Sequence, residues 1–291
     1  MMAEPSERGP DHAASAPIAA DQPIVTTEDA MTLASARSLS GRRGARLVLV
    51  MGEAGTGKTA LLAALWQRLI ERGELAGHSL AGSRTALAFE RRAHWARLDS
   101  RTPEASFPPS PPDEALLHLR VRRPDGARVE LLLADLAGEQ FERVREGRSL
   151  SAEIPWAARV DRAIVVVDAQ ALARPGESEI AITRAQRLVL ALETSGAVRD
   201  SARIALVLTK ADALGSAGEQ ALARHESPLA ALARQSDPEA TWIRTAALAG
   251  PGGDPDGLGA LMAWLCGDDR PPTPPQAPEV PLTRSIATFR A

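Results

Sequence analysis

The stretch GEAGTGKT at residues 52–59 decides the fold, since it fits the pattern G-x-x-x-x-G-K-[ST]. An apolar run at residues 47–51 precedes it and is typical of a short buried strand, while an amphipathic stretch at residues 60–70 follows as a helix. Strand, glycine loop and helix in this order predict a phosphate-binding loop, because backbone N–H groups and the helix N-terminus surround an anion. A Gly-rich turn without a ligand is the plain alternative, and the correct flanks on both sides argue against it.

Within this loop the sequence predicts separate roles for two side chains. Lys58 is expected to reach the β- and γ-phosphates and to take part in catalysis, and the Thr59 hydroxyl is expected to hold Mg²⁺. Nucleotide contacts are expected along the whole loop, at Gly52, Glu53, Ala54, Gly55, Thr56, Gly57, Lys58, Thr59 and Ala60. The chain contains only two lysines, Lys58 and Lys210, and its other basic residues are arginine. A compact ammonium, unlike a planar guanidinium, is therefore expected to matter at these two positions.

Composition limits the classes of partner. The 291 residues are 44% apolar, which allows one large domain or two small ones. A formal charge of -3 gives no field that would draw the chain onto nucleic acid or an anionic membrane. Cys266 is the only cysteine, which excludes an internal disulfide framework and favours a reducing, cytoplasmic compartment. No apolar run approaches about 18 residues and no signal peptide is evident, so no membrane span is expected.

The domain organisation follows from shifts in composition. Residues 1–40 are rich in Ala, Pro, Ser and Asp and are expected to form a disordered tail, with only a weak helical signal at residues 27–39. The main domain is expected at residues 45–268, and a Pro-rich tail at residues 269–291. This second tail is expected to be a spacer, with docking into a partner groove as the alternative.

A long insertion at residues 73–113 separates the phosphate loop from the next motif. Its middle, residues 85–98, is compatible with a helix, and residues 103–112 form a proline-rich loop. Several arginines between Arg84 and Arg101 are expected to lie on a solvated face, although one of them could act as an internal arginine finger. Phe89 and Trp95 favour a small core of the insertion itself over a docking patch for a partner.

The remaining pattern alternates strands and helices. Residues 115–123 and 127–134 are strand-like and flank the turn signal Pro124-Asp-Gly126, which predicts an antiparallel hairpin. Apolar runs predict further strands at residues 163–167, 204–208 and 242–244, and helical patterns cover residues 177–194, 220–234 and 258–265. The predicted fold class is α/β: a three-layer sandwich whose sheet is mostly parallel with one antiparallel edge strand.

Three more loops follow strands, at the sheet edge where open α/β folds bind ligands. Asp135-Leu-Ala-Gly138 is expected to contribute the Asp135 carboxylate to Mg²⁺, through water, and the Gly138 N–H to a γ-phosphate. Thr209-Lys-Ala-Asp212 is expected to bind a base: the Lys210 stem packs on the ring and Asp212 accepts two N–H groups of guanine. Adenine lacks that donor pair, which would leave the carboxylate unsatisfied. The backbone of Thr245 and Ala246 is expected to meet the guanine O6.

The order GEAGTGKT, DLAG, TKAD and TAA, with a hairpin between the first two, resembles the translation-factor-related (TRAFAC) class of P-loop GTPases over about residues 46–267. The stretches AGSRTALAFERR (residues 81–92) and LLLADLAGEQF (residues 131–141) are similar to the bacterial double-GTPase family. This resemblance implies a small-GTPase-like fold, Mg²⁺ with GTP or GDP, and a paired GTPase-like protein in a multi-component bacterial system.

The sequence departs from the usual GTPase pattern in three places. Thr209 stands where the guanine motif usually begins with Asn, so weaker bracing of the loop is expected. Glu139 stands where small GTPases carry the glutamine that orients the attacking water, and Gln140 is one position further on. The switch threonine that coordinates Mg²⁺ is expected to be Thr85, with Ser83 as the alternative.

Asp168, which directly follows the strand at residues 163–167, is interpreted as a turn or cap residue rather than a ligand.

Three functions are compatible with these motifs. The leading hypothesis is a molecular switch that binds GTP with Mg²⁺ and hydrolyses it, with Lys58 and Glu139 in catalysis. The alternative is a non-hydrolysing interaction module that binds nucleotide in order to dock a paired protein, which Glu139 motivates. An ATPase or small-molecule kinase is disfavoured by the hairpin and by the TKAD motif.

Overall fold

The computed structural model describes residues 24–25, 30–99, 116–194, 202–236, 240–246 and 257–268. The strands are β1 Ile24–Val25, β2 Arg46–Met51, β3 Glu74–Leu75, β4 His78–Ser83, β5 Leu116–Arg122, β6 Arg128–Asp135, β7 Arg162–Asp168, β8 Arg203–Thr209 and β9 Thr241–Arg244. The helices are α1 Leu33–Arg43, α2 Lys58–Arg72, α3 Ala86–Asp99, α4 Gly138–Arg145, α5 Leu150–Glu153, α6 Ala169–Ala173, α7 Ser178–Thr194, α8 Ser216–Ala223, α9 Glu226–Ser236 and α10 Leu258–Cys266. Two 3₁₀ turns, η1 Ala157–Arg159 and η2 Ala211–Ala213, complete the described elements.

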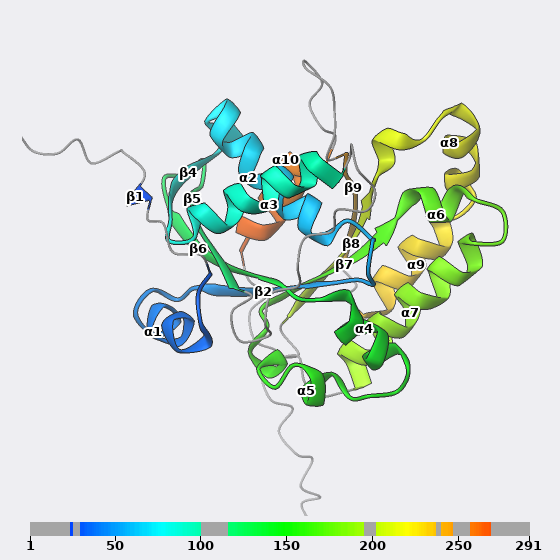
Figure 1. Ribbon diagram of the computed structural model, residues 1–291, viewed down its shortest axis with the longest axis horizontal. Coiled ribbons are helices and arrows are strands. Elements are labelled where there is room, and N and C mark those ends of the chain that lie inside the picture. The colour runs from blue at the N-terminus through cyan, green and yellow to red at the C-terminus, as the bar shows by residue number, and fades with distance from the viewer. Residues whose placement is uncertain are drawn as a thin grey trace, which may run out of the picture.

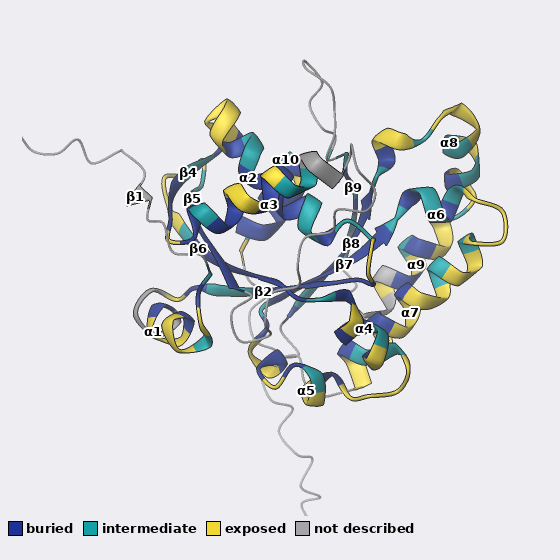
Figure 2. Cartoon of the chain, viewed as in Figure 1, coloured by how far each residue is buried: buried dark blue, intermediate teal, exposed yellow. Residues whose placement is uncertain are grey.

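The described strands form a single mixed sheet with helices on both faces (Figure 1). Its order is β1-β4-β5-β6-β2-β7-β8-β9, with β3 paired to β4. The pairs from β6 through β2, β7 and β8 to β9 are all parallel. One apolar cluster joins α2, α3 and α10 to one face, and a second joins α1, α4, α7 and α9 to the other. The predicted α/β class is therefore confirmed, and the sheet is the buried middle layer (Figure 2).

The predicted hairpin is present as β5 and β6. The two strands pair antiparallel from Leu116 opposite Ala134 to Arg122 opposite Arg128. The turn closes where the Gly126 N–H donates to the Arg123 carbonyl at 2.9 Å, and Gly126 has a φ of 85°, a left-handed conformation that favours glycine.

The sheet extends further than the sequence indicates. Residues 74–83, which belong to the predicted insertion, form β3 and β4, and β4 pairs antiparallel with β5. The antiparallel strand β5 therefore lies inside the sheet instead of at its edge. The sequence did not predict β4, whose residues are HSLAGS. Strands are recognised by Val, Ile, Thr, Tyr, Phe and Trp, and β4 contains none of these.

Residues 30–40, which the sequence assigns to a tail, pack on the domain, and this part of the prediction is corrected. Met31 is 1% exposed and its N–H donates to the Leu116 carbonyl at 2.9 Å. α1 follows and buries Ala36 and Leu39 against the sheet. α1 has few large apolar residues, so its sequence shows little of the hydrophobic periodicity that marks an amphipathic helix. Its packing therefore becomes visible only in the tertiary structure. The predicted tail at residues 269–291 lies outside the described residues.

Most predicted helices are confirmed, with one difference. The pattern at residues 220–234 is interrupted, and α8 ends before α9 begins at Glu226. In the part of the chain that the structure describes, none of the helices combines the length and apolar character needed to cross a membrane.

α3 is fixed against α2 by aromatic stacking. The rings of Trp66 and Phe89 lie parallel, with centroids 4.9 Å apart, and the Trp66 Nε1–H donates to the Glu90 carboxylate at 2.7 Å. Phe89 is fully buried in the apolar cluster of the domain, so the expected separate core of the insertion is corrected: the ring packs on α2, and Trp95 is only partly buried. The insertion is thus held on the helix that begins at the phosphate loop.

Replacing Phe89 with alanine is expected to lower the free energy of unfolding by about 3–5 kcal/mol, because a fully buried ring is lost and a cavity remains. Urea unfolding of the whole chain measures this. Leu190→Ala, at a side chain that is 54% exposed, is the control and should change stability by no more than about 0.5 kcal/mol. Equal effects of the two substitutions would contradict the docking of α3.

Candidate nucleotide-binding site

The four predicted loops meet at one edge of the sheet. β2 ends at Met51, β6 at Asp135, β8 at Thr209 and β9 at Arg244, and each motif begins at or directly after one of these ends. Because the four strands run parallel within one sheet, their carboxyl ends lie side by side. The structure therefore brings together segments that are up to about 190 residues apart in the sequence.

The phosphate loop is braced from β8. The Thr209 hydroxyl donates to the Thr56 carbonyl at 2.6 Å, and the Lys210 ammonium donates to the Gly55 carbonyl at 2.7 Å. A Cβ atom at Gly57 would lie 3.3 Å from the Thr209 Oγ1, so glycine permits this close approach. Thr209 therefore braces the loop by a direct hydrogen bond, although the sequence suggested weaker bracing from this residue.

Asp168 serves as a cap and also holds Lys210. Its Oδ1 accepts from the Gln170 N–H at 2.8 Å as the N-cap of α6, which confirms the interpretation as a cap residue. Its Oδ2 lies 2.7 Å from the Lys210 Nζ. Lys210 itself has a φ of 57°, a left-handed conformation that costs energy for a residue with a Cβ. The ammonium of Lys210 is thus held between Asp168 and the Gly55 carbonyl of the phosphate loop.

Lys58 lies over the phosphate loop and is buried. Its ammonium donates to the carbonyls of Gly52 and Glu53 at 2.8 and 2.9 Å. Burial is the largest influence on the pKa of Lys58 and lowers it below the usual 10.5, while nearby carboxylates, Asp135 first, act in the opposite direction. A phosphate group here would replace two neutral acceptors with charged ones.

Two oxygen groups that suit Mg²⁺ lie together beneath the loop. The Thr59 Oγ1 is 3.2 Å from the Asp135 Oδ1, and Asp135 is 5% exposed. A hydroxyl and a carboxylate are hard oxygen ligands of the kind that Mg²⁺ takes, with phosphates and waters completing its shell. No group of three or more acidic, histidine or cysteine side chains that could hold a metal occurs among the described residues.

The hydroxyls of Thr85 and Ser83, the two candidates for the switch ligand, are engaged with β5. The Thr85 Oγ1 accepts from the His118 N–H at 2.8 Å, and the Ser83 hydroxyl donates to the His118 carbonyl at 2.7 Å. Both residues are buried. Among the described residues, neither hydroxyl forms a hydrogen bond with Thr59 or Asp135.

α4 is fastened to the phosphate loop at both of its ends. A Cβ atom on Gly138 would lie 2.2 Å from the Ala54 N, so only glycine allows the first turn to sit this close. At the last turn, Arg145 lies 2.7 Å from the Glu53 carboxylate as an ion pair whose geometry is not that of an aligned hydrogen bond. Arg184 of α7 pairs with the other Glu53 oxygen at 2.7 Å. Glu53 thus joins the loop to two helices.

Glu139 and Gln140 point to different environments. Glu139 is exposed at the start of α4, and its charge is one of the influences that oppose the lowering of the Lys58 pKa by burial. Gln140 is 5% exposed and lines a cavity with Leu33, Arg37 and Trp156. Of the two side chains, that of Glu139 therefore faces solvent and that of Gln140 is buried.

The base-binding loops are held by backbone contacts. The Thr245 N–H and hydroxyl both bind the Leu208 carbonyl, at 2.7 and 2.8 Å, and the Ala211 N–H donates to the Thr245 carbonyl at 3.3 Å. Asp212 is exposed, and its carboxylate makes no hydrogen bond to another described residue. Its expected contact with a guanine base stays a prediction. Ala246 is the last described residue of its segment.

Two buried polar side chains have partners that no sequence motif indicates. The carboxylate of Glu130 lies 2.6 Å from His118 Nε2 and 2.7 Å from Arg120 Nε. Burial acts to raise the pKa of Glu130, but these two hydrogen bonds outweigh it and the pKa falls below its usual value. The second group is Arg92, which is 2% exposed and pairs with Asp135. Arg92 follows Phe89 by three residues, and this helical spacing was the available signal that it faces inward.

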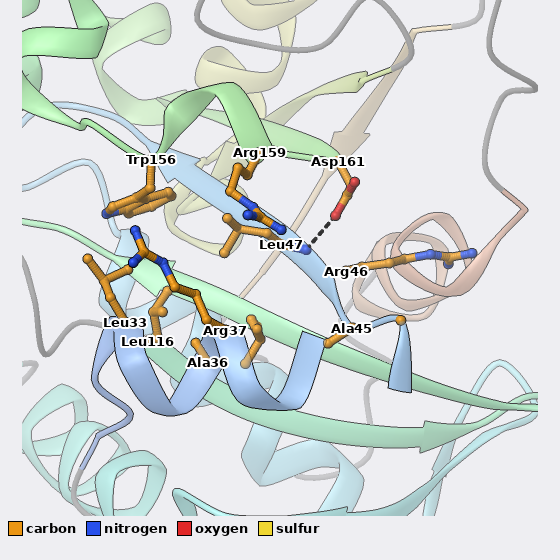
Figure 3. Close-up of a pocket in the computed structure, with 12 residues that line it drawn as sticks. Leu33, Ala36, Arg37, Ala45, Arg46, Leu47, Leu116, Trp156, Arg159 and Asp161 are labelled. Atoms are coloured by element: carbon orange, nitrogen blue, oxygen red, sulfur yellow. Dashed lines mark hydrogen bonds between the residues drawn. The ribbon is translucent and has the colours of Figure 1, made fainter. Parts of the chain in front are cut away.

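A separate cavity of about 220 Å³ lies away from these loops, between α1 and η1 (Figure 3). Leu33, Leu116 and Trp156 line it, and the guanidinium groups of Arg37 and Arg159 stand at its rim. It opens near the starts of β2 and β7, whereas the motifs lie at the ends of these strands. We therefore assign the nucleotide site by its motifs and not by the size of the cavity.

A mostly parallel sheet with the four loops at one edge is the arrangement of an open α/β fold that binds ligands at the carboxyl ends of its strands. The family model "Double-GTPase 2" matches residues 46–265. The chain therefore belongs to the Double-GTPase 2 family. No curated protein matches the chain in sequence.

Among solved structures, the chain is similar to translation elongation factors. The apo form of SelB from Methanococcus maripaludis is 17% identical with a TM-score of 0.39, covering 77% of this chain and 34% of that one. The same factor with the GTP analogue GppNHp is 15% identical, with a TM-score of 0.39 over 78% and 34% of the chains. A bacterial selenocysteine-specific elongation factor, EF-Sec, is 16% identical, with a TM-score of 0.40 over 75% and 27%. This chain thus spans about a third or less of these factors, and the family assignment rests on the family model.

Lys58→Met is expected to change how stability depends on pH. Since the pKa of Lys58 is lower in the folded chain, the unfolded chain binds more protons between the lowered pKa and 10.5. The cost of the buried charge is present below that window and fades as the pH rises through it. Urea unfolding at several pH values should show the wild type gaining stability relative to Lys58→Met as the pH approaches 10.5. Parallel pH curves for the two proteins would contradict the burial of this charge.

Proposed function

We propose that this protein is a Mg²⁺-dependent molecular switch that binds GTP and hydrolyses it to GDP and phosphate. The observation that carries the proposal is the meeting of the four loops at one sheet edge, with Lys58 and the exposed Asp212 at two ends of one site. Membership of the Double-GTPase 2 family supports it.

In the proposed complex, backbone N–H groups of residues 53–60 surround the β-phosphate, and the N-terminus of α2 faces it. Lys58 exchanges its loop carbonyls for the β- and γ-phosphates. Asp212 accepts two N–H groups of guanine, the Lys210 stem covers the ring, and the backbone of Thr245 and Ala246 lies near O6. Thr209 acts indirectly, because it fixes the loop that holds the phosphates.

Mg²⁺ is proposed to be held by Thr59 and, through water, by Asp135, and when bound it neutralises charge that develops on the phosphates. Thr85 is proposed to join this set only after its hydroxyl leaves the His118 N–H. The Gly138 N–H is proposed to meet the γ-phosphate, since the backbone of Gly138 lies directly against Ala54 of the phosphate loop. Residues 73–113 and 135–151 are thus the proposed switch segments.

Glu139 is proposed to orient the attacking water, since it is the exposed side chain at the start of α4. Its carboxylate can accept a proton from water, whereas Gln140 is directed into the domain. A paired GTPase-like protein, in a bacterial multi-component system, is the proposed partner, as the resemblance of the motifs to the double-GTPase family implies. Such a partner could complete the placement of the water.

Asp212→Asn is expected to weaken GDP and GTP binding by at least about a hundredfold, because the amide offers one donor where guanine needs two acceptors. The same variant is expected to gain affinity for xanthosine diphosphate, whose C2 carbonyl can accept that donor. Equilibrium binding of fluorescent nucleotides measures both effects.

Asp125→Asn, in the exposed hairpin turn, is the matched control and should leave both affinities unchanged. Equal binding of ATP and GTP by the wild type would contradict a guanine-specific site and would favour an ATPase or kinase.

Glu139→Ala is expected to slow single-turnover GTP hydrolysis by roughly a hundredfold with little change in GTP affinity, because a water-orienting group is removed. Gln140→Ala, at the adjacent position, is the control and should retain the wild-type rate. Absence of hydrolysis by the wild type, with and without its partner, would contradict the switch. The protein would then be a nucleotide-binding interaction module.

A further inference from the structure

Arg92 is a buried cation on the inner face of α3. Ala88, Phe89, Arg92 and Ala93 are all at most 2% exposed, while the neighbouring Arg91 is exposed. α3 packs beside α2 (Figure 1), the Phe89–Trp66 stack fixes its rotation, and Arg92 is buried on the same face as Phe89. A solvated helix face, the expectation for these arginines, therefore does not describe Arg92.

The partner of Arg92 is the proposed metal-binding carboxylate. The Arg92 Nε lies 2.7 Å from the Asp135 Oδ2, and its NH1 group donates to the Ala88 carbonyl at 3.2 Å. The other oxygen, Asp135 Oδ1, is 3.2 Å from the Thr59 hydroxyl. Each carboxylate oxygen of Asp135 thus has a partner: Oδ1 meets Thr59 of α2, and Oδ2 meets Arg92 of α3.

This pairing has an electrostatic consequence for a divalent cation. A guanidinium in contact with Asp135 cancels the negative charge that attracts Mg²⁺, and in a buried site it also repels the ion over a short distance. The Arg92 N–H occupies an acceptor that a metal-bound water would otherwise use.

We propose that Arg92 competes with Mg²⁺ for Asp135. With α3 docked, the guanidinium neutralises the carboxylate, and loading of the metal with nucleotide transfers Asp135 from Arg92 to the metal's waters. The hold of Asp135 on α3 is thereby weakened, so that metal loading is coupled to the position of the insertion. The inference rests on the proposed function, because it assumes that nucleotide and Mg²⁺ bind beside Thr59.

The test is the Mg²⁺ dependence of nucleotide retention by the whole chain. Fluorescent GDP is bound, free Mg²⁺ is set with a chelator, and the concentration that gives half-maximal retention is measured for wild type and Arg92→Gln. Arg92→Gln is expected to need about tenfold less Mg²⁺, because a unit charge that opposes the divalent ion is removed. Arg91→Gln, at the exposed adjacent position on the same helix, should behave as the wild type.

The opposite outcomes separate the possible roles of Arg92. A higher Mg²⁺ requirement in Arg92→Gln would mean that Arg92 orients Asp135 for the metal, and an unchanged requirement would mean a structural ion pair. Either result overturns the competition. Failure of the wild type to bind GDP at any Mg²⁺ concentration would instead overturn the proposed function.

Thermal unfolding checks that each variant is folded. If Arg92→Gln does not fold, Arg92→Lys decides the question, because lysine keeps the charge but cannot reproduce the Nε and NH1 contacts together. It is expected to lower the Mg²⁺ requirement by a smaller factor, about threefold, since the charge remains while its hold on Asp135 is loosened. A requirement equal to or above that of the wild type overturns the inference.

Discussion

The organisation of the site depends on hydrogen bonds to the carbonyl groups of the phosphate loop. A loop whose N–H groups face a ligand leaves its carbonyls without partners from regular secondary structure. Here side chains supply those partners: Lys58 binds the carbonyls of Gly52 and Glu53, Lys210 binds that of Gly55, and Thr209 binds that of Thr56. The use of lysine at only two positions now has a geometric reason, because a compact ammonium can reach between closely spaced carbonyls, whereas a planar guanidinium is broader.

The same loop connects the site to α3 and α4, which belong to the proposed switch segments. Glu53 pairs with Arg145 of α4 and Arg184 of α7, and the Ala54 backbone leaves no room for a side chain at Gly138. Asp135 connects the helix of the loop with α3 through Thr59 and Arg92. The contacts that hold α3 and α4 therefore use residues that are also proposed to bind the nucleotide or its metal. A bound ligand can move these segments only by such a difference in contacts.

The site also shows how function opposes stability. The buried Lys58 has a lowered pKa, Lys210 adopts a left-handed backbone, and Asp212 faces solvent at the end of the sheet. None of these features is the best choice for folding alone, and the two clusters of apolar side chains on the sheet faces offset their cost. The rigid sheet thus allows strained and charged groups to be held close together.

The sequence by itself determined the fold class, the hairpin and the four loops, because each motif is local and follows a strand whose direction is set by its helix connections. It also indicated that Asp168 is a cap. Only the tertiary structure decided that residues 31–39 pack on the sheet, that β4 extends it, that Gln140 faces inward and that Arg92 pairs with Asp135. These features depend on how one element is rotated and placed against another. The Trp66–Phe89 stack sets that rotation for α3, and no spacing within residues 86–99 specifies which carboxylate Arg92 meets.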